Sequence, residues 1–244
     1  MIVANRKDIR ELRAMVEPYK RVLIVGCGTC VTVCLAGGER EVAIIGSSLR
    51  MALRLAGKTD VEVDECTLER QCDAAFFEPL SETIAPYDAI LSLACGVGVQ
   101  EMAVQFPDKA VLPGLNTQFM GTLEDQGIWA ERCLGCGDCR LAEFGAVCPI
   151  TRCAKRLFNG PCGGSREGRC EVSDDLPCAW QLIYDRMKTL GQLDRLKAIA
   201  PIMDWSRGID GGPRRVVRED QRITLPPASG GIVPASTRIL KPET

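Results

Sequence analysis

The distribution of cysteine constrains this chain more than any other feature of its sequence. Fourteen of the 244 residues are cysteine and none is histidine. Eight cysteines crowd into one stretch, namely Cys133, Cys136, Cys139, Cys148, Cys153, Cys162, Cys170 and Cys178. Eight thiolates make two sets of four, which is the ligand set of two iron–sulfur clusters. The lack of histidine excludes mixed Cys/His zinc sites, histidine-dependent catalysis and haem held by a proximal His.

The cellular compartment decides how these cysteines are interpreted. The first twenty residues are polar and lack the apolar core of a signal peptide, and no apolar run is long enough to span a bilayer. We therefore expect a cytoplasmic protein, in which thiols stay reduced and clustered cysteines bind metal more often than they form disulfides. The net charge of -2 gives no reason to expect nucleic acid or a membrane as a partner.

Short β-branched runs alternate with helical patterns in the first half of the chain. Strands are expected at 21–25, 42–45, 61–63, 89–93 and 110–112, and helices at 8–19, 47–56, 74–84 and 99–106. This alternation predicts an α/β fold, a parallel Rossmann-like sheet with helices on both faces.

The composition changes near Gly121. We expect an α/β domain over 1–120, then a cysteine-rich iron–sulfur module over 121–205 that is mostly irregular or helical and lacks strands up to Cys178. Metal would supply much of the stability of such a module. Residues 206–244 carry no periodicity, and we expect them to be disordered or to form an extended arm lying on a partner.

The strongest local signal is the Cys-x₂-Cys-x₂-Cys run that begins at Cys133. Two-residue spacings allow three thiolates from one loop to hold three corners of a [4Fe–4S] cubane, and Gly135 and Gly137 permit the backbone angles of such a loop. The second cluster would take most of the remaining cysteines. Two Cys₄ zinc sites are the alternative, but zinc ribbons normally show two separate Cys-x₂-Cys pairs.

A third group of cysteines lies in the predicted sheet domain. Cys27, Cys30 and Cys34 follow the first strand, and Cys95 follows the strand at 89–93. Those strands are commonly neighbours in doubly wound sheets, so their carboxyl ends would bring the four thiols together. The site would hold a third [4Fe–4S] cluster or zinc. Cys66 and Cys72 compete for the fourth position, and several of these thiols could instead be buried packing groups.

Several elements of the sequence resemble known reductase subunits. They are Arg132-Cys133-x₂-Cys136-Gly137-Asp138-Cys139, Cys148-Pro149-Ile150-x-Arg152-Cys153, Asn159-Gly160-Pro161-Cys162-Gly163-Gly164, Cys170-Glu171 and Cys178-Ala179-Trp180. Together they resemble the C-terminal cysteine module of methylenetetrahydrofolate reductases. The front half, with Gly26-Cys27-Gly28-x-Cys30 and Leu93-Ala94-Cys95-Gly96, resembles MetV-type iron–sulfur accessory subunits of the two-subunit reductases of acetogenic and related anaerobes.

This resemblance implies a division of labour between two polypeptides. The folate and flavin sites would belong to a MetF-type flavoprotein partner, and this chain would pass electrons to that flavin from an external donor such as ferredoxin or another redox subunit. The reaction supported would be reduction of methylene-tetrahydrofolate to methyl-tetrahydrofolate, in the one-carbon chemistry of the Wood–Ljungdahl pathway. We identify no catalytic residue in the chain itself. The alternative is a zinc-stapled adaptor without a redox role.

Overall fold

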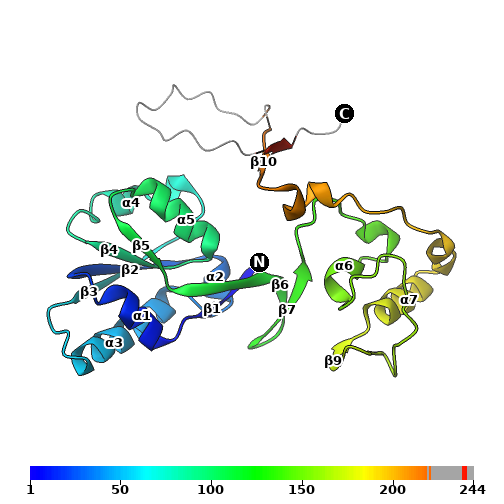
Figure 1. Cartoon of the computed structure of the whole chain (residues 1–244), viewed down its shortest axis with the longest axis horizontal. Coiled ribbons are helices and arrows are strands. Elements are labelled where there is room, and N and C mark those ends of the chain that lie inside the picture. The colour runs from blue at the N-terminus through cyan, green and yellow to red at the C-terminus, as the bar shows by residue number, and fades with distance from the viewer. Residues whose placement is uncertain (219, 221–237, 241–244) are drawn as a thin grey trace. The chain divides into compact units, whose positions relative to one another are not determined.

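The computed structural model describes residues 1–218, 220 and 238–240, and it divides into two compact units (Figure 1). The amino-terminal unit is Met1–Arg132, and the cysteine-rich unit is Cys133–Thr244. Each unit is described by itself. The three-part domain division expected from the sequence stays a prediction.

A four-stranded parallel sheet forms the centre of the amino-terminal unit, in the order β3-β2-β4-β5. Its strands are β2 (Arg21–Cys27), β3 (Glu62–Leu68), β4 (Ala89–Leu93) and β5 (Ala110–Pro113). Its helices are α1 (Ile9–Val16), α2 (Cys30–Val33), α3 (Glu39–Leu55), α4 (Glu78–Ser81) and α5 (Gly96–Gln105), with a 3₁₀ turn η1 (Ala74–Phe76) before α4. The predicted parallel α/β sheet is confirmed.

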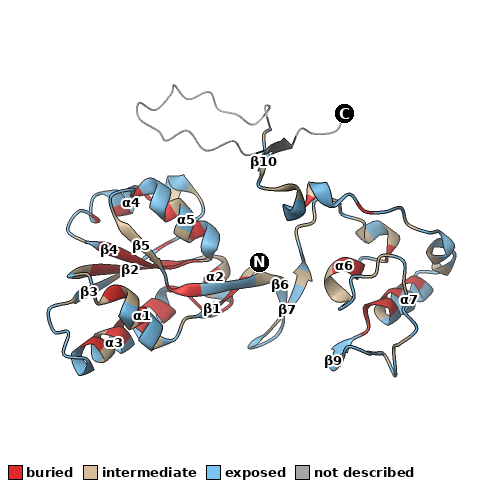
Figure 2. Ribbon diagram, in the orientation of Figure 1, coloured by how far each residue is buried: buried red, intermediate tan, exposed pale blue. Residues whose placement is uncertain are grey.

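Helices cover both faces of this sheet, and Figure 2 shows its two central strands buried almost throughout. Because successive side chains of a strand point to opposite faces, β2 contributes to two separate cores. Val22 and Ile24 pack with α1 and α3, whereas Leu23 and Val25 pack with α4 and α5. The sheet is therefore a rigid support whose carboxyl edge remains available for a site.

The strand expected at 42–45 is wrong, because these residues lie in helix α3. Val42, Ile45, Leu49 and Leu53 are buried at helical spacing, whereas Ile44 is exposed. Glu41 accepts a hydrogen bond from the backbone N–H of Gly38 (3.2 Å), which satisfies a free donor at the helix start. A four-residue apolar run does not distinguish a strand from a buried helix face, and here the longer helical period decides. The helix expected over 74–84 is reduced to η1 and the short α4.

A second sheet, in the order β1-β6-β7, completes this unit. Its strands are β1 (Ile2–Arg6), β6 (Leu115–Asp125) and β7 (Ile128–Cys133). β1 pairs antiparallel with β6. The expectation that strands end near Gly121 is wrong, because a two-residue turn with Gly127 in the left-handed region (φ 84°) sends the chain back along β7. β7 ends at Cys133, the first cysteine of the dense stretch.

The cysteine-rich unit is built of short elements around a small core. They are η2 (Leu141–Glu143), α6 (Pro149–Arg152), β8 (Arg169–Cys170), β9 (Ser173–Pro177), α7 (Ala179–Thr189), η3 (Leu193–Lys197), η4 (Trp205–Arg207), η5 (Ile209–Gly211), β10 (Arg214–Val216) and β11 (Arg238–Leu240). β8 and β9 form an antiparallel pair that the sequence did not predict. The buried core consists of five side chains, namely Phe144, Cys178, Trp180, Ile183 and Met187. Such a core is too small to hold a unit of this length by itself.

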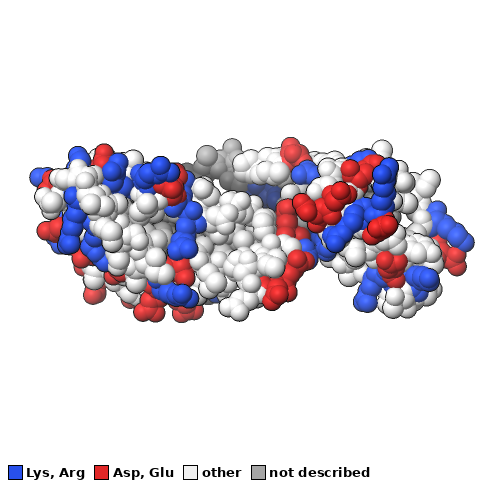
Figure 3. Space-filling model, turned by 90° about the horizontal axis from the view of Figure 1, so that it is seen from below, with Lys and Arg blue, Asp and Glu red and all other residues white. Residues whose placement is uncertain are grey.

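The carboxy-terminal end of the chain is described only in part. Residues 205–218 contain two 3₁₀ turns and β10, and β10 pairs in parallel with β11. The rest of the arm expected over 206–244 lies outside the described residues. Within the part that is described, none of the helices has the length and apolar character needed to cross a bilayer. Figure 3 shows Lys/Arg and Asp/Glu side chains mixed over the face in view, as expected for a net charge of -2.

Candidate iron–sulfur site

The first three cysteines of the dense stretch lie on one tight loop. Gly135 and Gly137 both adopt left-handed backbone angles (φ 67° and 87°), which an L side chain adopts only with strain. The loop can therefore reverse direction between each pair of cysteines. The Gly135 N–H donates to the sulfur of Cys133 at 3.4 Å. An amide that already points at a thiol is the kind of donor that stabilises thiolate and adjusts the potential of a bound cluster.

Cys148 begins helix α6 as its N-cap residue, with Pro149 in the first turn. Its sulfur lies 3.5 Å from the hydroxyl of Thr151. The cysteine spacing does not decide whether Cys148 belongs with the first three cysteines or with the last four.

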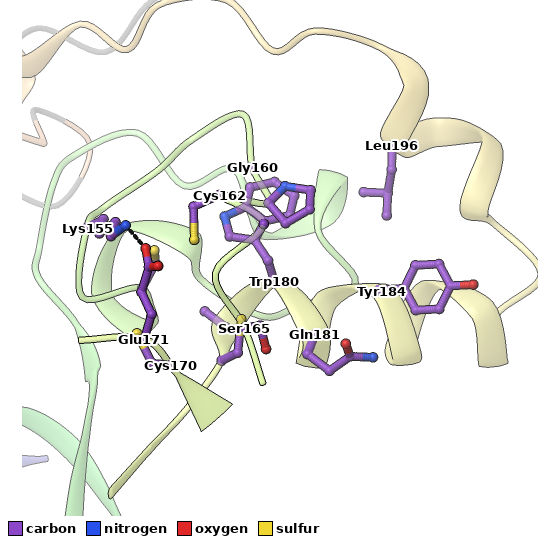
Figure 4. Close-up of a pocket in the computed structure, with 15 residues that line it drawn as sticks. Lys155, Gly160, Cys162, Ser165, Cys170, Glu171, Trp180, Gln181, Tyr184 and Leu196 are labelled. Atoms are coloured by element: carbon purple, nitrogen blue, oxygen red, sulfur yellow. Dashed lines mark ion pairs between the residues drawn. The ribbon is translucent and has the colours of Figure 1, made fainter. Parts of the chain in front are cut away.

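The last four cysteines of the stretch line one cavity of about 450 Å³. These are Cys153, Cys162, Cys170 and Cys178. They come from the end of α6, the Gly-rich loop, β8 and the start of α7, so four separate segments contribute one thiol each. Figure 4 shows Cys162 and Cys170 on the side of the Lys155–Glu171 ion pair, with Trp180 beside them. Segments distant in sequence thus converge on one set of four sulfurs.

Cys178 is held in a state that favours the thiolate. Burial by itself would raise its pKa. Hydrogen bonds from the backbone N–H groups of Gln181 and Trp180 and from the Ser165 side chain outweigh burial and hold the pKa below its ordinary value. The thiol is the N-cap of α7, where free amide groups and the helix dipole stabilise negative charge. On the opposite wall, Gly164 N–H donates to the Cys162 sulfur (3.5 Å).

Trp180 fixes the floor of this cavity. Its indole N–H donates to the Leu157 carbonyl (3.0 Å), and its ring packs edge-on against Phe144 with centroids 5.7 Å apart. Gly160 approaches the indole so closely that any Cβ at that position would collide with the ring. The Asn-Gly-Pro-Cys loop therefore requires glycine at this position to place Cys162 on the wall.

The candidate ligands of both sets are thiols alone. Among the residues that the structure describes, no three Cys, Asp or Glu side chains are already arranged to hold a metal ion. The second set of thiols lines a cavity, and the first set lies on a glycine-hinged loop with an amide directed at sulfur. Thiolates without imidazole or carboxylate partners are soft ligands, which suit iron–sulfur clusters and zinc.

The amino-terminal cysteines come from several elements of the sheet unit. Cys27 ends β2, and Cys95 is the N-cap of α5, just beyond β4, the strand that pairs with β2. The pKa of the Cys72 thiol is raised first by burial and then by Cys27 and Cys95, which are near enough to act on it. Cys34 is buried in the core, as Cys27 is; its sulfur contacts the carbonyls of Ala4 (3.8 Å) and Val31 (3.7 Å), and burial raises its pKa.

Two other cysteines complete this group. Cys30 is the first residue of the short helix α2 and lies near Cys34. Cys66 lies within β3, where burial raises its pKa to about 11. Of the two competitors weighed from sequence, Cys72 is the one that the fold places beside Cys27 and Cys95.

A buried glutamine explains the position of Cys72. The Gln71 amide donates to the carbonyls of Val25 (2.9 Å) and Gly26 (2.8 Å) on β2, and the Ser92 hydroxyl of β4 donates to its oxygen (2.7 Å). Gln71 and Ser92 are both fully buried. The bonds fix the loop after β3 over the seam between β2 and β4. Sequence reasoning missed Gln71, since only the sheet order reveals that both strands lie within its reach.

Comparison with known proteins gives one match. The model of a family described as methylene-tetrahydrofolate reductase C terminal matches residues 112–206. The match covers less than half of the chain, and it contains all eight cysteines of the dense stretch. No curated protein and no solved structure matches significantly. This region of the chain is therefore similar to the C-terminal part of methylenetetrahydrofolate reductases, as its cysteine and glycine elements predicted.

Proposed function

We propose that this chain is an iron–sulfur electron-transfer subunit, of the MetV type, that serves a MetF-type methylenetetrahydrofolate reductase flavoprotein. The observation that carries the proposal is the convergence of Cys153, Cys162, Cys170 and Cys178 on one cavity within the region similar to that reductase family. In this role, two [4Fe–4S] clusters would accept and release single electrons.

The residues of this chain would bind the clusters and set their surroundings. The second set of four thiols would hold one cluster, and Cys133, Cys136 and Cys139 would hold the other, with Cys148 as the remaining candidate for its fourth ligand. Amide groups of Gly135 and Gly164 donate toward sulfur, and hydrogen bonds hold the pKa of the Cys178 thiol below its ordinary value. The partner flavoprotein would contribute flavin and folate binding, and an external redox protein would be the electron donor.

A direct test uses the anaerobically purified chain and a flavoprotein reductase from the same source. The chain, reduced with dithionite and freed of excess reductant, should bleach the flavin of the partner. Cys162→Ser should remove about half of the iron and slow this reaction. Protein that contains its full iron content but transfers no electrons to the flavin would contradict the electron-transfer role.

A zinc-stapled adaptor is the second candidate, favoured by the all-thiolate donor set, which also suits zinc. It predicts a colourless protein that binds the flavoprotein without reducing it. Iron and zinc analysis of the same preparation separates the two candidates.

For the amino-terminal thiols we propose a third metal, either a [4Fe–4S] cluster or zinc. The positions of Cys27, Cys72 and Cys95 indicate a test that needs no activity. Cys72→Ser should lower the metal content of the chain, whereas Cys34→Ser, a core thiol, should leave it unchanged. Loss of metal in Cys34→Ser and not in Cys72→Ser would instead support the ligand set expected from sequence, namely Cys27, Cys30, Cys34 and Cys95.

A further inference from the structure

The segment after α7 returns to the first cysteine loop. Residues 204–214, which we call the strap, form the 3₁₀ turns η4 and η5 and enter β10. The strap is held internally, because Asp204 accepts from the Ser206 N–H (3.0 Å) and the Gly208 N–H donates to the Trp205 carbonyl (2.9 Å). The strap therefore has a defined backbone conformation.

The strap contacts the loop at the glycine hinges. A Cβ at Gly137 would collide with the carbonyl of Arg207, and a Cβ at Gly208 would lie 3.3 Å from the carbonyl oxygen of Cys136. Both contacts are backbone against backbone, so no flexible side chain can adjust to relieve them. Glycine at 137 therefore serves two purposes, the left-handed turn and the close approach of the strap.

Arg214 ties the two segments together. One guanidinium nitrogen of this residue donates to the carbonyl of Gly135 (3.0 Å) and to the carbonyl of Arg207 (2.9 Å). Arg140, also near this loop in sequence, is instead engaged by carboxylates, with Glu143 at 2.5 Å and Asp138 at 3.9 Å. In the part of the chain described here, the hydrogen-bond partners of the Arg214 side chain are these two backbone carbonyls and no carboxylate.

We propose that Arg214 is a positioning and potential-setting residue for the cluster held by Cys133, Cys136 and Cys139, and that the strap supports the backbone of their loop. The inference rests on the proposed function. A fixed cation beside a cluster favours its reduced, more negative state. The strap also gives residues 204–214 a role within this chain, in addition to the partner docking expected for the arm.

The test measures reduction potentials by anaerobic titration followed by low-temperature EPR. Arg214→Gln should shift one cluster signal to lower potential and leave the other in place, and Arg214→Lys, which keeps the charge, should shift less. Arg215→Gln is the matched control, because Arg215 is the next residue of β10 and is exposed. Equal shifts in R214Q and R215Q, or no shift in R214Q, would overturn the inference.

Iron content separates this inference from the proposed function. Wild-type protein without iron–sulfur signals would contradict the proposed function itself, before any variant is made. Loss of about half of the iron in R214Q, restored in R214K, would support the positioning role. The same loss in R215Q would count against it, since that arginine lies outside the contact.

Discussion

The two units of this chain are stabilised by different means. The amino-terminal unit buries two groups of side chains, twenty and nine residues, on opposite faces of its central sheet, whereas the cysteine-rich unit buries a group of five. Burial of apolar surface can account for the first unit. The second unit needs another source of stability, and its eight thiols are the available one. The amino-terminal unit is therefore held by its sheet, and we propose that the cysteine-rich unit is held by metal bound to its thiols.

The largest expected effect comes from removing the metal. Chelation of iron after oxidation should unfold most of the cysteine-rich unit and leave the sheet unit folded, because the small core around Trp180 cannot hold its loops alone. Hydrogen exchange with mass spectrometry would follow α7 and β4 in the same sample. Undiminished protection of α7 after complete iron loss would break the comparison.

Truncation of a core side chain of the sheet should destabilise the amino-terminal unit and spare the cysteine-rich unit. Leu91→Ala, at a fully buried position of β4, should destabilise the amino-terminal unit by about 2–5 kcal/mol while the iron content stays near wild type. Urea unfolding followed by exchange of β4 amides would measure it. Leu55→Ala is the control, since Leu55 is 84% exposed and its truncation should cost less than about 0.5 kcal/mol. Iron loss in L91A would show that the units depend on one another.

Removal of the buried glutamine should have a smaller effect, confined to the edge of the sheet. Gln71→Ala removes the hydrogen bonds of the Gln71 amide with the Ser92 hydroxyl and with two β2 carbonyls, which should cost about 1–3 kcal/mol. Gln105→Ala serves as the control, because Gln105 is exposed and, among the described residues, its side chain bonds only to the Glu101 carboxylate. Thermal unfolding of both variants gives the difference. Equal melting temperatures would argue against the role of Gln71 in holding the Cys72 loop.

The smallest effect distinguishes two left-handed glycines of the cysteine-rich unit. Alanine at either Gly137 or Gly163 should introduce backbone strain of about 1–2 kcal/mol. Only Gly137→Ala also collides with the strap, whereas Gly163 has open space around its Cα. Bleaching of the clusters by oxygen, followed by visible absorbance, should therefore be faster in G137A than in G163A. Matching rates would indicate that the strap does not protect the first loop.

The sheet could be predicted from sequence because β2 and β4 are short apolar runs, with Gly26 near the end of the first and Cys95-Gly96 shortly after the second. The first turns of α3 could not be predicted, because the apolar run at 42–45 fits a buried strand and a buried helix face equally well. Only tertiary packing decides between the two. β1 was missed because its polar residues Asn5 and Arg6 hide the alternation. The Cys-x₂-Cys-x₂-Cys run was evident from spacing alone. The grouping of the last four around one cavity depends on α6, β8 and α7 meeting, which spacing does not encode.

Residues that act at long range were the hardest to predict. Arg214 is 79 positions from Gly135, and Gln71 is 46 from Val25, so neither contact leaves a local pattern. Both residues bond to backbone carbonyls, a chemistry that any donor side chain could supply, and the fold alone selects these two.

The central claim is that the thiols between Cys133 and Cys178 hold iron–sulfur clusters. Metal analysis of oxygen-free protein, with low-temperature EPR on the dithionite-reduced sample, tests it most directly. The account predicts about eight iron atoms per chain from these two sites and signals of two reduced [4Fe–4S] centres. A colourless protein that contains zinc and no iron would contradict it.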